Sequence, residues 1–293
     1  MNHYLNKLKS FDIVIVLYCI ITGIYMLFGY YQLHNILHHI FLRILFVAII
    51  FFLIKAEESE NKILLFVRNF YPLIFLGFFY SETDYYNNLI FENFDPGLIH
   101  LEELFFNTHL SLDFSKYIYF QWFSELMHFG YFSYYILTIS IPLIFYIKSY
   151  DQFERVMFII FLSFCFYYLI FILFPSVGPQ FYFHVEQRSV PNGYLFHEIM
   201  KFIISIGETE TGAFPSSHVG MATIYLLLMY KNFKKIFTLI LPIVIILVFS
   251  TVYIKAHYVI DIIGGLITGI LFYYFSNKIY SKYFLGITKP NIT

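Results

Sequence analysis

Charged residues are scarce in this chain of 293 residues. They make up only 13% of the sequence, whereas hydrophobic residues make up 59%. Soluble globular domains carry about 25% charged residues, so this composition excludes an ordinary soluble protein. The formal net charge of −1 also lacks the basic excess that binds nucleic acid, and we expect no nucleic-acid partner.

Cysteine is rarer still, and the sequence contains only two, Cys19 and Cys165. Each lies in the middle of an apolar run, so we interpret both as packing residues, and a disulfide framework is excluded. The first apolar run lacks a small-residue cleavage site after it. This favours a retained span over a signal peptide.

Long apolar runs recur from one end of the sequence to the other. A helix needs about 20 mostly apolar residues to cross a bilayer, so the runs predict an all-α, polytopic transmembrane helix bundle of about eight spans. We expect these spans at Phe11–Tyr31, His38–Ile54, Ile63–Tyr80, His128–Ile147, Val156–Phe174, Ser216–Tyr230, Ile236–Ile254 and His257–Tyr280. The sixth is short enough to be buried among its neighbours instead of facing lipid.

Lysine and arginine are distributed unevenly between the two sides of this bundle. With eight spans both termini share a side, and most basic residues, such as Lys148, Arg155 and Lys231, fall on it. Because cytoplasmic loops carry an excess of basic residues, we expect the termini to be cytoplasmic. Two long connections, residues 81–127 and 174–215, then face the extracytoplasmic (periplasmic or luminal) side. The first contains "LIHLEELFF", which suggests a helix lying at the membrane interface.

The unusual polar residues of the second half fall on one side of the membrane. They lie in "FPSVGPQFYF" (Phe174–Phe183), "FPSSH" (Phe214–His218) and "STVYIKAHYVID" (Ser250–Asp261), each at the outer end of a predicted span. Ionisable groups within membrane segments are costly and mark functional sites. Three separate segments therefore predict one polar site at the outer membrane–water boundary.

The residue types in these segments indicate phosphoryl transfer. His257 and Asp261 are four residues apart and would share a helix face, so the carboxylate can orient the imidazole. His218 is available as an acid or base near neutral pH. Ser216 and Ser217 lie at a helix N-terminus, where free N–H groups favour an anion. Together they suggest transfer through a phosphohistidine.

These residues resemble the motifs of the type-2 phosphatidic acid phosphatase superfamily. "PSSH" (Pro215–His218) resembles its second motif, Pro-Ser-x-His, and Ser250, His257 and Asp261 resemble its third in order and spacing. More closely, "FPSSHVGMAT" and "STVYIKAHYVIDIIGG" resemble the branch that contains the inositol phosphorylceramide synthases and related bacterial membrane phosphatases. The resemblance extends from Asp95 to the end of the eighth span.

The resemblance implies a role for each residue of the two motifs. His257 would be the nucleophile and Asp261 its orienting partner. His218 would protonate the departing alkoxide, and Ser216 would bind phosphate. Ser217 is more typical of a helix start than of a ligand.

The sequence departs from the family pattern at two places. The arginine of the third motif is replaced by Thr251, and "SVGPQ" (Ser176–Gln180) stands where the first motif belongs. The sequence therefore leaves open which cation balances the charge of the phosphate, and we rank Lys255 and Arg188 before Lys201. The residues that we consider for substrate binding are Ser216, Ser217, Gln180, Arg188 and Lys255.

The resemblance implies an integral membrane lipid phosphatase or phosphotransferase that acts on a lipid phosphate or a phospholipid headgroup. Water or a lipid alcohol would accept the phosphoryl group, and headgroup transfer of the inositol phosphorylceramide synthase type is one form of this activity. Nothing in the sequence implies a metal or an organic cofactor. The alternative is a proton-coupled transporter or lipid flippase that uses His257 and Asp261 as a relay. The oligomeric state is left open.

Four regions follow from this interpretation. Residues 1–81 form N-terminal transmembrane spans, and residues 82–127 form an extracytoplasmic, interfacial segment. Residues 128–280 form a catalytic transmembrane core, with a six-helix phosphatase-like arrangement toward the C-terminus. Residues 281–293 form a cytoplasmic tail.

Other notable residues have structural interpretations. Gly264, Gly265 and Gly269 are typical of close helix packing. The carboxylates of Asp95, Glu103 and Glu125 could contact a headgroup, but solvated or capping carboxylates are more common. The histidines of "HNILHH" (His34–His39) resemble one histidine box of a membrane di-iron oxygenase, yet such sites need several boxes. We therefore interpret this cluster as interfacial.

The charge asymmetry makes a testable prediction about sidedness. A cysteine introduced next to Arg188, for example by Ser189→Cys, should react with a membrane-impermeant thiol reagent added from outside the cell. A Ser149→Cys control on the opposite side should react only after permeabilisation. Labelling of position 189 from the cytoplasm alone would contradict the predicted orientation.

Overall fold

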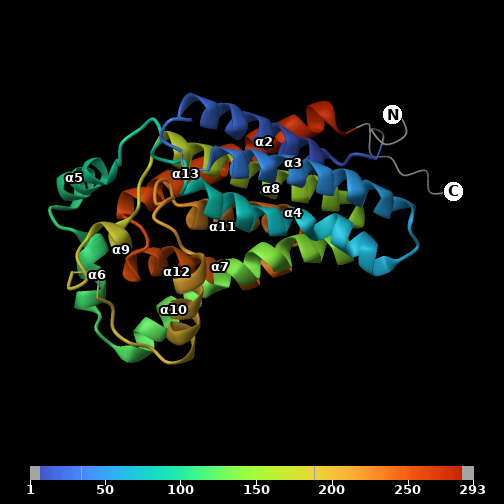
Figure 1. Ribbon diagram of the computed structural model, residues 1–293. Helices are drawn as coiled ribbons and strands as arrows, with labels where there is room; N and C mark the ends of the chain where they lie inside the picture. The colour runs from blue at the N-terminus through green and yellow to red at the C-terminus, as the bar shows by residue number, and fades with distance from the viewer. Residues whose placement is uncertain (1–6, 34, 188, 286–293) are drawn as a thin grey trace.

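The computed structural model describes residues 7–33, 35–187 and 189–285, and within these ranges it is helical without a strand. Its helices are α2 (Ser10–Phe28), α3 (Ile36–Ile54), η1 (Lys55–Glu58), α4 (Lys62–Thr83), α5 (Asp95–Phe106), α6 (Leu110–Tyr117), α7 (Gln121–Lys148), α8 (Tyr150–Leu173), α9 (Pro179–Tyr182), α10 (Leu195–Gly207), α11 (Ser217–Asn232), α12 (Lys234–Tyr253) and α13 (Val259–Tyr283). The long helices lie side by side as a bundle, and the short helices α5, α6, α9 and α10 gather toward one end of it (Figure 1). The predicted all-α bundle is confirmed.

Seven helices in the described part of the chain are long and apolar enough to cross a membrane, so this is a multi-pass integral membrane protein. The seven segments are Ser10–Phe28, Ile36–Glu58, Lys62–Thr83, Gln121–Lys148, Tyr150–Leu173, Lys234–Tyr253 and Val259–Tyr283. Their lipid-facing surfaces account for exposed apolar side chains such as Phe52 and Ile74. In a bilayer these side chains remain in an apolar environment.

Helix α11 corresponds to the short sixth span that the sequence predicts. Its 16 residues extend about 24 Å at about 1.5 Å per residue, which is less than the roughly 30 Å hydrocarbon core. It packs against α7, α8, α12 and α13. Met221, Ala222 and Ile224 on this helix are fully buried. The structure therefore shows α11 buried among its neighbours, as the sequence suggests.

The C-terminal part of the bundle is built around α8 and α11. The long helices in this part are α7, α8, α11, α12 and α13, and both α2 and α4 from the N-terminal part pack against α8. Side chains from these helices, including Phe145, Ile160 and Leu247, lie in one continuous apolar core. This core fixes the ends of the helices, where the polar segments begin.

Glycines allow α11 and α13 to approach closely. A Cβ atom added at Gly269 would lie 2.5 Å from the carbonyl oxygen of Gly220, and one at Gly265 would lie 2.5 Å from that of Ser216. Both distances are too short for any larger residue to fit without movement of the backbone. The sequence-based interpretation of these glycines as packing residues is confirmed.

The expected interfacial helix is α5, which is too short to cross the membrane. Its Leu104 and Phe105 are exposed, whereas Glu102 is fully buried. Glu102 accepts hydrogen bonds from the Ser111 hydroxyl at 2.6 Å and from the Val259 backbone N–H at 3.1 Å. One carboxylate thus fastens α5 to the starts of α6 and α13.

Buried ion pairs join the N-terminal helices. Glu82 lies 2.8 Å from His39 Nδ1 and 2.6 Å from Arg43 Nη1. Toward the other end of α4, Arg68 pairs with Asp12 of α2. His39 therefore holds α3 to α4, which supports a structural interpretation of its cluster; His34 of that cluster lies outside the described residues.

Substitution of Gly269 tests the close helix contact. Gly269→Ala should destabilise the protein by about 1–3 kcal/mol because the new methyl group meets backbone atoms of α11. Gly77→Ala is a matched control, because a Cβ at Gly77 has no neighbour within 4 Å. Thermal unfolding in detergent should therefore show a lower Tm for the first variant only. Equal Tm values would contradict the tight α11–α13 contact.

Candidate active site

The three polar segments singled out in the sequence meet at one end of the bundle. The Ala213 N–H donates to the Ser176 carbonyl oxygen at 3.1 Å, and the Phe214 N–H donates to the Ser176 hydroxyl at 2.8 Å. The Ser216 N–H donates to the Asp261 carbonyl oxygen at 3.0 Å. The segment after α8, the segment before α11 and the start of α13 therefore form one hydrogen-bonded unit.

His257 and His218 face each other at the centre of this unit. His257 Nε2 lies 3.3 Å from His218 Nδ1, and only 3% of His257 is exposed. His257 Nδ1 lies 2.8 Å from the carbonyl oxygen of Ala213. Because a carbonyl oxygen can only accept, Nδ1 carries the proton of the neutral ring. Nε2 then keeps its lone pair, directed toward His218.

Asp261 lies beside the same nitrogen. Its Oδ2 is 3.4 Å from His257 Nδ1 and accepts a hydrogen bond from the Tyr258 backbone N–H at 2.8 Å. The sequence predicts a helix that carries both His257 and Asp261, but α13 begins only at Val259. His257 lies in the turn before it. The carboxylate is thus close enough to stabilise a positive imidazole, whereas Ala213 provides the nearer acceptor.

The ring of His218 is fixed by two tyrosines of α7. Its centroid lies 4.5 Å from that of Tyr131 and 4.2 Å from that of Tyr134. His218 itself lies in the first turn of α11, whose free N–H groups favour an anion near this end. These contacts fix the plane of the ring, and Nδ1 is the nitrogen that faces His257.

The two serines of the site have capping positions. Ser216 is the N-cap of α11, and its hydroxyl oxygen accepts from the Val219 N–H at 3.3 Å. Ser217 is the first residue of the helix, as its sequence position suggests, and both serines are buried. The Ser216 side chain, expected to bind phosphate, is therefore already engaged in starting the helix that carries His218.

Glu208 is a site residue that sequence reasoning missed. Its carboxylate accepts from Gln180 Nε2 at 2.6 Å and from the Tyr131 hydroxyl at 2.9 Å, which places it beside the ring stack on His218. Burial raises the pKa of the Glu208 carboxyl. The hydrogen bonds from Gln180 and Tyr131 act in the opposite direction and lower the pKa of this carboxyl. Gln180 is the predicted substrate-binding residue that this cluster contains.

Of the predicted phosphate-binding cations, Lys255 is the one whose contacts the structure describes. Lys255 is 1% exposed, and its ammonium donates to the carbonyl oxygens of Leu112 at 3.0 Å and Gln187 at 2.8 Å. Burial lowers its pKa to about 8. The ammonium of Lys255 therefore ties the α12–α13 turn to neighbouring backbone instead of facing His257. Arg188 lies outside the described residues.

Asp95 holds the loop between α8 and α9 in place. Its Oδ1 accepts from the Gly178 N–H and the Tyr258 hydroxyl, both at 2.9 Å, and its Oδ2 accepts from the Val177 N–H at 2.9 Å. The carboxylate is fully buried. Asp95 is thus a structural clamp between the α8–α9 loop and the start of α13.

The two other carboxylates that the sequence suggests as headgroup contacts are also engaged. Glu125 accepts from the backbone N–H groups of Tyr194 at 2.6 Å and Phe196 at 2.7 Å, at the start of α10. Glu103 lies 3.0 Å from His109 Nε2. These contacts agree with the interpretation as capping or solvated carboxylates.

A family model described as the PAP2 superfamily matches residues 98–275, a range that includes His218, His257 and Asp261. No curated protein and no solved structure matches the chain.

Removal of the Asp95 carboxylate tests its role as a clamp. Asp95→Ala should leave the Val177 and Gly178 N–H groups and the Tyr258 hydroxyl without their acceptor, at about 1–3 kcal/mol for each buried unpaired donor. The Tm should fall by several degrees. Glu92→Ala, an exposed carboxylate three residues earlier, should change stability by less than about 0.5 kcal/mol. An unchanged Tm for Asp95→Ala would contradict the clamp.

Proposed function

The chain belongs to the PAP2 superfamily, and we propose that it transfers a phosphoryl group from a membrane lipid through a covalent bond to His257. Membership supports a lipid phosphatase-type enzyme. The observation that carries the finer proposal is the orientation of His257. Its Nδ1 is engaged by Ala213 at 2.8 Å, so Nε2 keeps its lone pair. A substrate phosphate would replace the contact of Nε2 with His218 Nδ1, 3.3 Å away.

In the first half of the reaction, His257 Nε2 attacks the phosphorus of a lipid phosphate ester. The N–P bond forms as the P–O bond to the lipid alkoxide breaks, and protonated His218 gives its proton to that oxygen. The positive charge that develops on the phosphorylated ring is stabilised by Asp261, 3.4 Å from Nδ1. The first turn of α11 supplies N–H groups for the non-bridging oxygens.

In the second half, water or an alcohol attacks the same phosphorus atom. Neutral His218 accepts the proton of the attacking hydroxyl group, and the N–P bond breaks to restore His257. Water as the acceptor gives free phosphate, and a lipid alcohol gives a new phosphorylated lipid. A headgroup transferase of the inositol phosphorylceramide synthase type would follow the second course.

We place this chemistry on the extracytoplasmic side. Lys148, Arg155 and Lys231 lie at or near the ends of α7, α8 and α11 that are remote from the histidine pair. Since basic residues accumulate on the cytoplasmic side, this distribution supports an outward-facing site.

Histidine variants with product analysis test the proposal. His257→Ala should abolish turnover of a labelled lipid phosphate or phospholipid, and His218→Ala should lower kcat by about 10²–10⁴-fold because proton transfer is lost. His184→Ala, an exposed histidine in the loop after α9, is the control and should retain activity. Each variant should keep the wild-type Tm within a few degrees.

The products decide between the two acceptors. Free phosphate that is lost in His257→Ala would indicate a phosphatase, and a phosphorylated lipid formed only with ceramide, diacylglycerol or an inositol lipid would indicate a transferase. Full turnover by folded His257→Ala would contradict the mechanism. Absence of any product across such a panel would favour the alternative of a transporter or flippase.

A further inference from the structure

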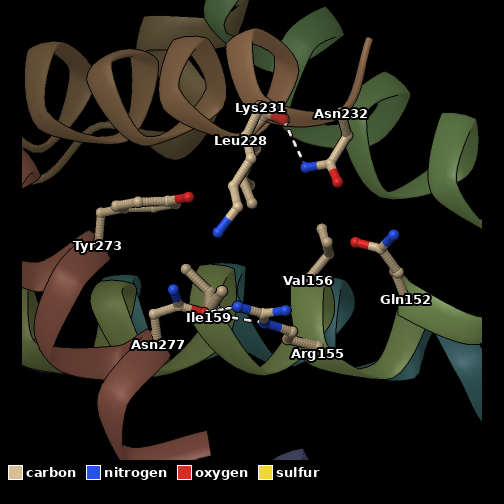
Figure 2. A pocket seen from close by; sticks show the side chains of 9 residues that line it. All are labelled: Gln152, Arg155, Val156, Ile159, Leu228, Lys231, Asn232, Tyr273 and Asn277. Carbon is tan, nitrogen blue, oxygen red and sulfur yellow. Dashed lines mark hydrogen bonds between the residues drawn. The ribbon is translucent and has the colours of Figure 1, made fainter. Parts of the chain in front are cut away.

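A polar pocket lies at the end of the bundle remote from the histidine pair. It lies between α8, α11 and α13 and is partly open to solvent, and its empty space of about 250 Å³ includes some of that solvent. Its lining consists of Gln152, Arg155, Val156, Ile159, Leu228, Lys231, Asn232, Tyr273 and Asn277. Figure 2 shows the amino group of Lys231 and the hydroxyl of Tyr273 directed into the same space that the Arg155–Asn277 pair borders.

The charge of this lining is positive, because it contains an arginine and a lysine but no carboxylate. Arg155 donates from Nε at 2.8 Å and from Nη2 at 2.6 Å to one neutral partner, Asn277 Oδ1. This bond fixes the guanidinium without neutralising its charge. Among the described residues, neither Arg155 nor Lys231 has an ion pair with a carboxylate.

The position of the pocket relates it to the membrane interface. Lys231 follows His218 by 13 residues on the same helix, which corresponds to about 20 Å along the axis. Val156, Ile159 and Leu228 give the pocket an apolar wall on the side of the bundle interior. The charged groups thus lie close to the end of α11, at the level where lipid headgroups meet the helix ends.

We propose that this pocket binds the phosphate group of an anionic phospholipid headgroup. The Arg155 guanidinium, the Lys231 ammonium and the Tyr273 hydroxyl match the oxygens of a phosphate. Asn232 Nδ2 already donates to the Leu228 carbonyl oxygen at 2.8 Å and has one further hydrogen to donate. Basic pockets between transmembrane helices on the cytoplasmic side are suited to anionic headgroups. The ligand joins α8, α11 and α13, and two of these helices, α11 and α13, also carry His218 and Asp261.

The pocket can be tested without turnover at the histidine pair. Purified His257→Ala protein in neutral detergent is titrated with phosphatidylglycerol, with diacylglycerol of the same acyl chains and with inorganic phosphate, and the Tm is followed. Phosphatidylglycerol should raise the Tm in a saturable way, and diacylglycerol should not. Adding Lys231→Gln should weaken the apparent affinity by roughly tenfold, as expected for loss of one charge-assisted contact.

A second lysine provides the matched control. Lys231 and Lys235 are both exposed, but only Lys231 lines the pocket, so Lys235→Gln should leave the affinity unchanged. Lys231→Gln without lipid should have the parental Tm, which verifies its fold. Unchanged affinity in Lys231→Gln, or an equal loss in Lys235→Gln, would overturn the proposal. If inorganic phosphate raises the Tm of the parental protein but not that of Lys231→Gln, the result would support a phosphate-binding site whose ligand is a soluble anion.

Discussion

The hydrogen bond from His257 Nδ1 to the Ala213 carbonyl oxygen is the contact on which the proposed chemistry depends. It fixes the tautomer and the ring plane, and it leaves Nε2 directed at His218. The position of Ala213 depends on Ser176, which holds the backbone on both sides of it. Gly178 allows that loop to approach, because a Cβ there would lie 2.6 Å from the Ala256 carbonyl oxygen. The orientation of the His257 imidazole thus depends on the loop that contains Ser176 and Gly178 and on the loop that contains Ala213.

Burial of polar groups beside a membrane is costly unless each group has a partner. This protein meets the constraint with carboxylates that accept from backbone N–H groups. Asp95 accepts a hydrogen bond from the backbone of the α8–α9 loop, Glu102 from the start of α13, and Glu125 from the residue before α10. These side chains replace water at helix and loop ends, so the polar site can form at the end of an apolar bundle.

Much of this arrangement was predictable from the sequence, because apolar runs of span length determine the helices and their alternation brings the polar segments to one side. The spacing of Gly265 and Gly269 likewise indicated close packing. The acceptor for His257 was not predictable, since a backbone carbonyl leaves no trace in residue identity. The direction of Lys255 depends on its left-handed backbone, with φ of 66°. Glu208 stands in a loop whose path is determined only by tertiary contacts.

The central claim is that His257 carries the phosphoryl group during turnover. The most direct test is to quench the purified enzyme at alkaline pH during reaction with a ³²P-labelled lipid phosphate and to map the label by mass spectrometry. The account predicts an acid-labile, base-stable phosphoryl group on Nε2 of His257 that is absent from His257→Ala. A label on another residue would contradict this claim. Full turnover by both the wild type and His257→Ala without any labelled protein would also contradict it.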